Sequence, residues 1–469
     1  MLQRVLCLAL LLFGILGSGL TVSAEPDTLT LDQAVQMALK ADYQIKAAMN
    51  DLEVAKLAVR NEAVKIFPKA DIGGQYRYQA ANDTYPNSFQ IVIQETIPTT
   101  WNLYGQKIVS GIAAAGWDQV SAEAALQIKQ AEIICNTCED YCNVLKAQQV
   151  LKLQTEALEK QRKASALAIQ QLNLGKITKP DQLKIENFLN QAEFNLEKDR
   201  SELEIARQKL ANQIGLEDLV NLDLAETTLS PDAMDLKLDA LQEKALKRRL
   251  ELQKAEINIK KAQRVWAQAR NAELPTVSLG YNSQSETRSL GLNYEFTNGD
   301  LSWFAAEQSG SDQSQADVLS GTDNSQGYYG NNQNYFTLKL SWSVDFGSAA
   351  NDTNQSRYNL DNARLDLEKE RQAILLEVKQ ALADYQLAVK EYETNQKALP
   401  YYEKDLEIKR LQEQLGAITC IDLATAEQDA ASARITAVRS GWDRYLTLQK
   451  LKKAVGDLYP FDQLEEKHS

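Results

Sequence analysis

Apolar residues recur along the chain with two different periods. In several stretches they return at alternating three- and four-residue steps, the spacing that gives a coiled-coil helix one apolar face. In other stretches apolar and polar residues alternate one by one, which predicts strands with one apolar and one polar face. The first helical stretch contains Ile45, Ala48, Leu52, Ala55, Val59 and Ile66. The two patterns together predict an α+β protein.

Two helices are predicted to be much longer than the helices of a globular domain. The helical pattern runs from about residue 106 to 173 and again from about 350 to 414. At a rise of about 1.5 Å per residue, the first would be about 100 Å long. A globular core does not accommodate rods of this length. We therefore expect them to pack along each other or along the helices of other chains.

Strands are predicted between the helices in both halves of the chain. Their apolar faces would suit either a soluble core or lipid. Because the helices use their apolar faces on one another, lipid is the better candidate. The predicted strands cover about residues 70–80, 88–97, 276–283 and 335–346.

An insertion of about residues 285–334 separates the last two strands. Within it, residues 290–296 alternate in polarity and Asn298-Gly299 is a tight-turn signal. This pattern predicts an additional hairpin that returns through residues 301–305. The rest of the insertion is rich in Ser, Gly, Asp, Asn and Gln, which predicts a surface loop.

The two halves repeat one plan of helix, two strands, very long helix, tight turn and helix. Leu31, Asp32 and Ala38 match Leu238, Asp239 and Ala245 at one constant offset. Further along, the first tip turn, residues 174–178, matches the second tip turn, residues 415–419, at a larger offset. The insertion accounts for the difference. The predicted organisation is a signal peptide over 1–24, repeat 1 over 25–235, repeat 2 over 236–458 and a C-terminal tail over 459–469.

The first residues have the order of a signal peptide. Arg4 supplies the positive start, residues 5–20 form the apolar run, and Val22-Ser23-Ala24 is a small-residue cleavage site. An uncleaved N-terminal membrane anchor is the alternative, and the cleavage site argues against it. Cys7 lies too early in this segment to be placed for lipidation. The pattern therefore predicts an exported protein.

Beyond this leader, no stretch reaches the ~20 apolar residues that a membrane-spanning helix needs. A mature chain that crosses a membrane would do so as a closed β-barrel, which also satisfies every backbone group. Known single-chain barrels begin at about eight strands. Since each chain is predicted to supply four, we expect several chains to share one barrel.

Composition excludes several classes of function. The 469 residues carry 51 Lys and Arg against 64 Asp and Glu, a net charge of −13, which disfavours nucleic acid as a partner. The one histidine is His468, and neither a nucleophile motif nor a phosphate loop is present. We therefore predict no enzyme activity, no catalytic residue and no cofactor.

The cysteines raise the question of a metal site. Cys135, Cys138 and Cys142 have the spacing C-x₂-C-x₃-C on a helix, and three thiolates at that spacing suit a metal ion. The same positions fall on the apolar face of that helix, where a free cysteine behaves as a small apolar side chain. We predict buried thiols rather than a metal site. Cys420 is the fourth cysteine of the mature chain.

Several stretches occur in an order that resembles the TolC-like outer-membrane efflux protein family. No single stretch is specific, but the duplicated order with both tip turns is. The resemblance covers nearly the whole mature chain. Its stretches are Leu29-Thr30-Leu31-Asp32-Gln33-Ala34, the helix ending at Pro68 before a strand, the mid-helix segment from Tyr141 to Gln148, and the turn Leu174 to Asp181 echoed by Leu415 to Asp422.

The resemblance implies a homotrimer. Its fold would be a duplicated helix–strand–strand–helix–helix repeat, with a trimeric α-helical coiled-coil barrel in the periplasm. This would join a shared 12-stranded transmembrane β-barrel in the lipid of the outer membrane, to which each chain gives four strands. A periplasmic adaptor, or membrane fusion protein, would meet the tip turns and link them to an inner-membrane transporter.

The implied function is a passive exit duct of a tripartite efflux or type I secretion system. A periplasmic coiled-coil adaptor and a structural protein of the envelope are the alternatives. They would share the helical hairpins but not two pairs of alternating strands. Neither the exported cargo nor the class of pump follows from the sequence.

The tip turns are the candidate adaptor-docking site. Glycine allows the chain to reverse sharply, and Thr followed by Asp three residues later begins each returning helix. Exposed Leu and Ile side chains would form a docking surface, although the same residues would also serve as simple turns. The candidate residues are Leu174, Gly175, Ile177, Thr178, Leu415, Gly416, Ile418 and Thr419.

Asp422 and Asp181 are candidates for the periplasmic aperture. The resemblance implies acidic residues near the tip of the second copy that line the constriction, and Asp422 is the position that carries over. Thr425 stands one turn further on, and Glu427 is a weaker substitute. The alternative is a carboxylate that stabilises the positive N-terminal end of its helix.

Overall fold

The computed structural model describes ten ranges of the chain in two compact units. The predicted signal peptide, the C-terminal tail, the strand ends 78–80 and 343–346, and loop residues 310–332 lie outside them. Unit 1 comprises Met1–Ala38, Thr137–Ser230 and Asp405–Val438, and unit 2 comprises Leu39–Asn136, Pro231–Lys404 and Arg439–Ser469. The described ranges are 28–77, 88–99, 107–216, 223–225, 237–272, 274–285, 288–297, 299–309, 333–342 and 347–458.

The helices form two series of nearly equal lengths. The first series has 11, 22, 67 and 36 residues, and the second has 11, 23, 67 and 36. Both very long helices predicted from the apolar pattern are confirmed, and the second continues through Pro400. The first series is α2 (Leu31–Ala41), α3 (Tyr43–Val64), α4 (Lys107–Asn173) and α5 (Lys179–Ile214), and the second is α6 (Leu238–Arg248), α7 (Leu250–Ala272), α8 (Ser348–Gln414) and α9 (Cys420–Val455).

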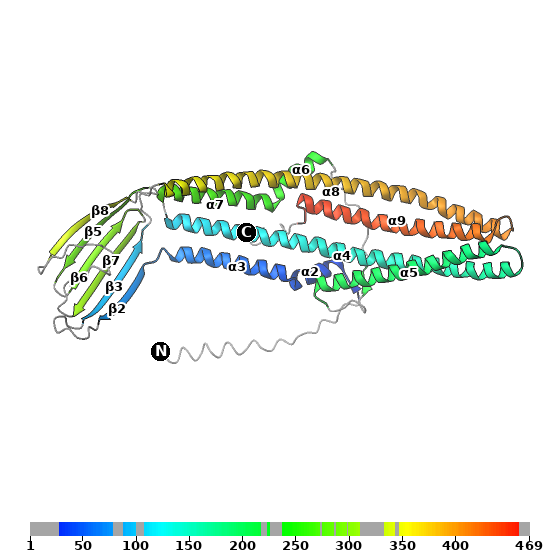
Figure 1. Cartoon of the computed structure of the whole chain (residues 1–469), viewed down its shortest axis with the longest axis horizontal. Coiled ribbons are helices and arrows are strands. Elements are labelled where there is room, and N and C mark those ends of the chain that lie inside the picture. Colours follow the sequence, from blue (N-terminus) through cyan, green and yellow to red (C-terminus); the bar gives the residue numbers. More distant parts are fainter. Residues whose placement is uncertain are drawn as a thin grey trace. The chain divides into compact units, whose positions relative to one another are not determined.

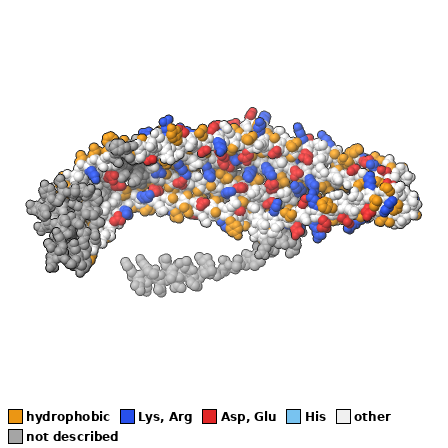
Figure 2. All heavy atoms as spheres, in the orientation of Figure 1, with side chains coloured by type: hydrophobic (Ala, Val, Ile, Leu, Met, Phe, Trp, Pro, Cys, Tyr) orange, Lys and Arg blue, Asp and Glu red, His pale blue; other side chains and the backbone are white. Residues whose placement is uncertain are grey.

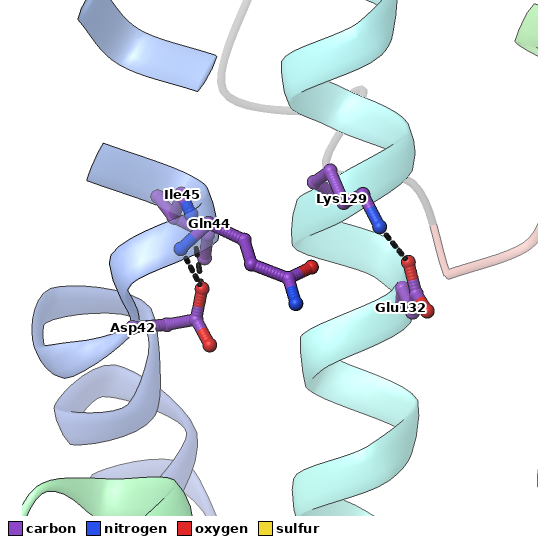
Figure 3. Close-up of polar contacts among 5 residues, drawn as sticks. All are labelled: Asp42, Gln44, Ile45, Lys129 and Glu132. Carbon is purple, nitrogen blue, oxygen red and sulfur yellow. Dashed lines mark hydrogen bonds and ion pairs between the residues drawn. The ribbon is translucent and has the colours of Figure 1, made fainter. Parts of the chain in front are cut away.

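Local hydrogen bonds define where these helices begin. Asp42 precedes α3, and its Oδ1 accepts hydrogen bonds from the backbone amides of Gln44 at 2.7 Å and Ile45 at 2.9 Å (Figure 3). Two amides of the first turn, which have no carbonyl partner within the helix, are thereby satisfied. On neighbouring α4, Lys129 and Glu132 form an ion pair of 2.7 Å across one helical turn (Figure 3). Such exposed pairs contribute only about 0.2–0.5 kcal/mol each.

Unit 2 contains a six-stranded antiparallel sheet in the order β2-β3-β7-β6-β5-β8 (Figure 1). The hairpin predicted in the insertion is confirmed as β6 and β7. The predicted count of four sheet strands per chain is wrong, because this hairpin joins the same sheet. The strands are β2 (Lys69–Arg77), β3 (Ser88–Pro98), β5 (Thr276–Gln284), β6 (Arg288–Glu295), β7 (Asp300–Ser309) and β8 (Gln333–Ser341).

The helical core of unit 2 joins α6, α8 and α9. Arg249, in the break between α6 and α7, is nearly buried and holds this junction. Its guanidinium donates to the Ala454 carbonyl at 3.1 Å and pairs with Glu377 at 2.9 Å. A buried cation with carboxylate and carbonyl partners avoids the cost of an unpaired charge. The core side chains include Leu241, Ala245, Ile374, Val378, Leu382, Leu448, Leu451 and Val455.

Unit 1 contains a short parallel pair of strands, β1 (Thr28–Leu29) and β4 (Asp223–Leu224). Tyr141 of α4 is fully buried, and its hydroxyl lies 2.8 Å from both the Leu29 and the Ala225 carbonyl oxygens. The Ala225 amide donates to the Leu29 carbonyl at 2.9 Å. One tyrosine thus anchors two distant segments of the chain to α4.

The outer faces of the helices carry charges of both signs, interspersed on the face drawn in Figure 2. Typical pairs are Lys247 with Glu243 at 2.6 Å and Lys198 with Glu202 at 3.7 Å, each four residues apart. None of the helices in the described ranges has an apolar stretch sufficient to carry it across a bilayer.

Candidate functional site

The two tip turns have the same backbone geometry and lie at the same end of unit 1 (Figure 1). In the first, the Gly175 amide donates to the Leu172 carbonyl and the Lys176 amide to the Gln171 carbonyl, both at 2.9 Å. The second repeats this arrangement from Gly416 to Glu413 and from Ala417 to Gln412, both at 2.8 Å. This pair of bonds is the Schellman motif, which satisfies the last carbonyls of a helix.

Both turns require glycine because of the backbone conformation. Gly175 has φ 68° and Gly416 has φ 70°, which lie in the left-handed region. A Cβ at either position would meet nothing within 4 Å apart from its chain neighbours. The constraint therefore comes from local backbone strain and not from crowding by other elements.

An aspartate caps the helix that follows each turn. Asp181 Oδ2 accepts from the Thr178 amide at 3.0 Å and from the Thr178 hydroxyl at 2.7 Å. Asp422 Oδ2 accepts from the Thr419 amide at 3.1 Å and from the Thr419 hydroxyl at 2.7 Å. The structure thus places both candidate aperture residues in reciprocal caps, which stabilise the start of a helix.

These hydrogen bonds also control protonation of the two carboxylates. The Thr178 hydroxyl and amide lower the pKa of Asp181, and the Thr419 hydroxyl and amide lower the pKa of Asp422. Lys184 adds a smaller lowering to the pKa of both. Both aspartates are therefore anionic at neutral pH, and a lysine of α5 lies near enough to act on the two together.

The apolar residues of the tip turns divide into an exposed and a packed set. Leu174 is 71% exposed and Leu415 is 83% exposed. Ile177 and Ile418 are half-buried, and Ile177 packs against an apolar cluster that contains Ile185. The leucines are therefore the side chains available to a partner, while Ile177 belongs to the packing of the turn itself.

A small apolar cluster joins the two hairpins behind the turns. Ile185 of α5 is fully buried against Ala168 of α4 and Ala424 and Cys420 of α9. Buried Gln161 also donates from Nε2 to the Ala424 carbonyl at 3.3 Å. Ile185, Ala168, Ala424 and Gln161 were not among the residues predicted from the sequence. Ile185, four residues after Asp181 on the same helical face, was the available signal.

Glu427 links α8 and α9 through an ion pair. It pairs with Arg410 of α8 at 3.2 Å, and its side chain is only 13% exposed. This contact crosses from the helix before the second tip turn to the helix after it, so it braces that hairpin.

None of the four cysteines in the described residues forms a disulfide, and all four are buried, as the apolar pattern predicts. The Cys138 side chain forms a hydrogen bond with Cys142, and this bond, together with burial, raises the pKa of the Cys142 thiol. Burial also raises the pKa of Cys420. Cys142 and Cys420 are therefore neutral packing residues at neutral pH.

One face of the sheet of unit 2 is mainly apolar, although Glu95, Arg288 and Glu307 also lie on it. Cross-strand partners lie on the same face of a sheet, so the register identifies its members. Several are largely exposed, for example Phe336 at 79% and Leu338 at 73%. The apolar face comprises Ile72, Tyr76, Phe89, Ile91, Ile93, Leu279, Tyr281, Leu290, Leu292, Tyr294, Leu301, Trp303, Ala305, Phe336, Leu338 and Leu340.

The opposite face of the sheet is mainly polar. Asn293, Ser302, Gln94 and Lys339 are among its members. Phe304 is an exception, and it covers Gly291 on the adjacent strand so closely that a Cβ there would lie 2.0 Å from its ring. An aromatic ring over a strand glycine compensates for the side chain that the glycine lacks.

A family model described as "Outer membrane efflux protein" matches residues 34–216 and 241–457 of this chain. The chain is 23% identical over 468 residues to the outer membrane protein TolC of Escherichia coli strain K12, covering 97% of this chain and 87% of that protein.

Solved structures share the fold. The Campylobacter jejuni CmeC outer membrane channel matches with a TM-score of 0.70 at 16% identity, covering 95% of this chain and 93% of that one. The outer membrane protein VceC of Vibrio cholerae matches with a TM-score of 0.69 at 15% identity, covering 91% of this chain and 96% of that one.

Proposed function

The chain belongs to the outer membrane efflux protein family, and from this premise we propose that it is a passive, non-catalytic exit duct in the outer membrane. Three copies would form the duct, which extends into the periplasm. A periplasmic adaptor and an inner-membrane transporter would supply the cargo and the energy, in tripartite efflux or type I secretion. One observation carries the proposal: a single chain joins an antiparallel sheet with an apolar face to two long hairpins with matched turns.

Exposed apolar stripes on two helices support the trimer. Leu183, Phe194 and Ile205 recur every eleven residues on α5 and are 51–64% exposed. Leu365, Leu376 and Leu387 recur at the same interval on α8 and are 55–67% exposed. Eleven residues correspond to three helical turns, so each set forms one straight stripe. Neighbouring copies of this chain would cover these stripes and complete a coiled-coil barrel.

The apolar face of the sheet would contact outer-membrane lipid. Side chains such as Phe336, Leu338 and Leu340 alternate with polar residues along β8, the pattern of a strand between lipid and a water-filled lumen. In the hydrocarbon region every backbone group needs a partner, which a closed barrel shared by the copies would supply. The predicted signal peptide would direct the chain to export.

The tip turns would dock on the adaptor through Leu174 and Leu415. Fully burying a leucine side chain contributes about 1.5–3 kcal/mol. A trimer would present these leucines in two sets of three around the periplasmic end. Gly175, Gly416, Thr178 and Thr419 would fix their presentation.

Asp422, with Asp181 at the equivalent place, would face the periplasmic aperture. Each cap uses Oδ2 of the carboxylate, and the lowered pKa keeps the charge at neutral pH. Three copies of such a carboxylate around a narrow opening would attract cations.

The division into repeat 1, repeat 2 and a C-terminal tail remains part of the proposal. The nearly equal helix lengths support it, as does the split of the family match into residues 34–216 and 241–457.

Two measurements test the function. Cell fractionation and native mass measurement in detergent should find the protein in the outer membrane as three copies. Recovery as a soluble periplasmic protein would instead support the adaptor or structural alternatives and overturn the duct.

Export tests the docking surface. Changing Leu174→Asp and Leu415→Asp together should abolish export while the trimer remains in the membrane. The matched control is Leu174→Met with Leu415→Met, which keeps the side chains apolar and should keep export. Normal export by the aspartate variant would exclude these leucines as the adaptor contact.

A further inference from the structure

The hairpin β6–β7 is an integral part of the sheet rather than an attachment to its edge. It stands between β3 and β5 in the strand order. β7 pairs with β3 from Phe89↔Ser309 to Pro98↔Asp300. On the other side, β6 pairs with β5 from Ser278↔Glu295 to Gln284↔Ser289. The hairpin therefore separates strands of the two halves of the chain that would otherwise be neighbours.

The hairpin has the same two faces as the rest of the sheet. Its apolar side chains lie in the cross-strand rows of β3 and β5, since Ile93 opposes Ala305 and Leu279 opposes Tyr294. The rows continue across the hairpin, where Leu290 opposes Ala305 and Leu292 opposes Trp303. The apolar side chains of β6 and β7 therefore lie on the same face as those of β3 and β5, as expected of strands that form part of a membrane-spanning wall.

Polar contacts fasten the hairpin to the strands beside it. Trp303 Nε1 donates to Glu95 Oε2 of β3 at 2.8 Å. At the base of the hairpin, the Thr99 hydroxyl donates to the Gly299 carbonyl at 2.7 Å. On the polar face, the Phe304 ring of β7 packs over Gly291 of β6, so the two strands of the hairpin are in close contact. The hairpin is thus packed as a structural part of the wall.

The two edges of the sheet suit pairing between copies. In the described sheet, β2 and β8 each pair on one side only. Each has nine residues. Every neighbouring pair in the order is antiparallel, so β8 runs antiparallel to β2. The β8 edge of one copy therefore matches the β2 edge of the next, and closure leaves no exposed edge.

We propose that three copies of this chain close an eighteen-stranded barrel, six strands from each, rather than the twelve-stranded barrel that four strands per chain would give. This rests on the proposed trimeric duct. Barrel diameter grows roughly linearly with strand number. The added hairpins therefore widen the outer-membrane exit about 1.5-fold, and barrels of about 16–18 strands leave an open aqueous channel.

Distances between copies test this count. With strands about 4.8 Å apart and tilted about 40°, three-fold-related backbone positions lie about 31 Å apart in eighteen strands and about 21 Å apart in twelve. Leu338→Cys, in the middle of β8 on the apolar face, would carry a spin label for pulsed electron paramagnetic resonance. The label's outward reach adds the same increment to both values. Background labelling of the native cysteines is measured on the protein without Leu338→Cys, in which the four described cysteines are buried.

A matched variant removes the hairpin. Gln284 of β5 lies directly opposite Gln333 of β8, so Asn-Gly in place of residues 285–332 would close a two-residue turn between them. We expect the distance between labels at Leu338→Cys to be about 1.5-fold longer in the full-length chain than in this deletion variant, before the label's reach is added. A label distance in the full-length chain that fits twelve strands overturns the inference, even where the deletion variant fails to fold.

Accessibility provides a second test within the hairpin. Leu292 and Asn293 are adjacent residues on opposite faces of β6, and both are exposed in the single chain. In intact outer membranes, a membrane-impermeant maleimide should label Asn293→Cys from the lumen and not Leu292→Cys, which faces lipid. Equal labelling of both would place the hairpin outside the wall and refute the proposal. A monomer in detergent would instead refute the trimeric duct on which it rests.

Discussion

Tyr141→Phe isolates the contribution of one buried hydroxyl to the anchoring of β1 and β4. The ring is fully buried, and the hydroxyl lies 2.8 Å from the carbonyl oxygens of Leu29 and Ala225. Phenylalanine keeps the ring and removes this donor. The Leu29 carbonyl still accepts the Ala225 amide at 2.9 Å, so the Ala225 carbonyl bears most of the loss.

The expected cost follows from that geometry. The hydrogen bond to Ala225 is only partly buried, so its loss costs about 0.5–1.5 kcal/mol. One factor of ten in an equilibrium corresponds to about 1.4 kcal/mol. If β1 and β4 open locally, the opening equilibrium should therefore rise about 2- to 13-fold. The rest of α4 should be unaffected, because the substitution leaves its packing intact.

Hydrogen exchange read by mass spectrometry measures this opening in the detergent-solubilised protein. Peptides that contain β1 and β4 should exchange faster in Tyr141→Phe by that factor. The control is Tyr401→Phe. Tyr401 is 67% exposed on α8, so loss of its hydroxyl should leave exchange at β1 and β4 unchanged. Unchanged exchange at both strands in Tyr141→Phe would refute the anchoring role of the hydroxyl.

Three further predictions concern the second tip turn. Gly416→Val should abolish export, and Gly416→Asn should retain it. A β-branched residue costs about 1–2 kcal/mol at positive φ, whereas asparagine tolerates that conformation. Equal export by the two variants would contradict this reason. Asp422→Asn should weaken cation selectivity and block by multivalent cations in single-channel recordings, with the trimer intact. The control Asp429→Asn, two turns further along α9, should change neither property. Unchanged selectivity in Asp422→Asn would leave Asp422 as a helix cap alone. Because Thr419 lowers the pKa of Asp422, the cap's stabilisation is complete above the unfolded pKa of about 3.9 and is lost as pH falls through the lower folded pKa. Exchange at the turn, corrected for the intrinsic rate, should then rise on acidification to about pH 3, and constant protection would show that the carboxylate does not stabilise the turn.

Much of the local structure could be predicted from the sequence alone. The helix expected at about 106–173 is α4 (Lys107–Asn173), because an uninterrupted apolar period and few helix-breaking residues act over neighbouring turns. The tip turns were equally predictable, since glycine, threonine and aspartate act on one another within seven residues. Alternation also determined which face of each strand is apolar.

Sequence patterns left other features open. Leu174 and Ile177 were equal candidates for an exposed docking surface. The structure separates them, because Ile177 packs on a cluster with Ile185 and Cys420, which belong to different hairpins. Likewise, the partners of the Tyr141 hydroxyl lie 84 and 112 residues away in the chain. Packing between such distant segments has no local signature.

Strand order was the feature that only the tertiary structure decided. The hairpin β6–β7 was predictable from its alternation and its Asn298-Gly299 turn, yet its place between β3 and β5 was not. Backbone hydrogen bonds between strands are nearly independent of side-chain identity, so many strand orders satisfy the same alternation. In the observed order, apolar residues of the hairpin lie beside apolar residues of β3 and β5, as Ala305 does beside Ile93 and Tyr294 beside Leu279, and that condition exists only when strands from both halves of the chain meet in one sheet.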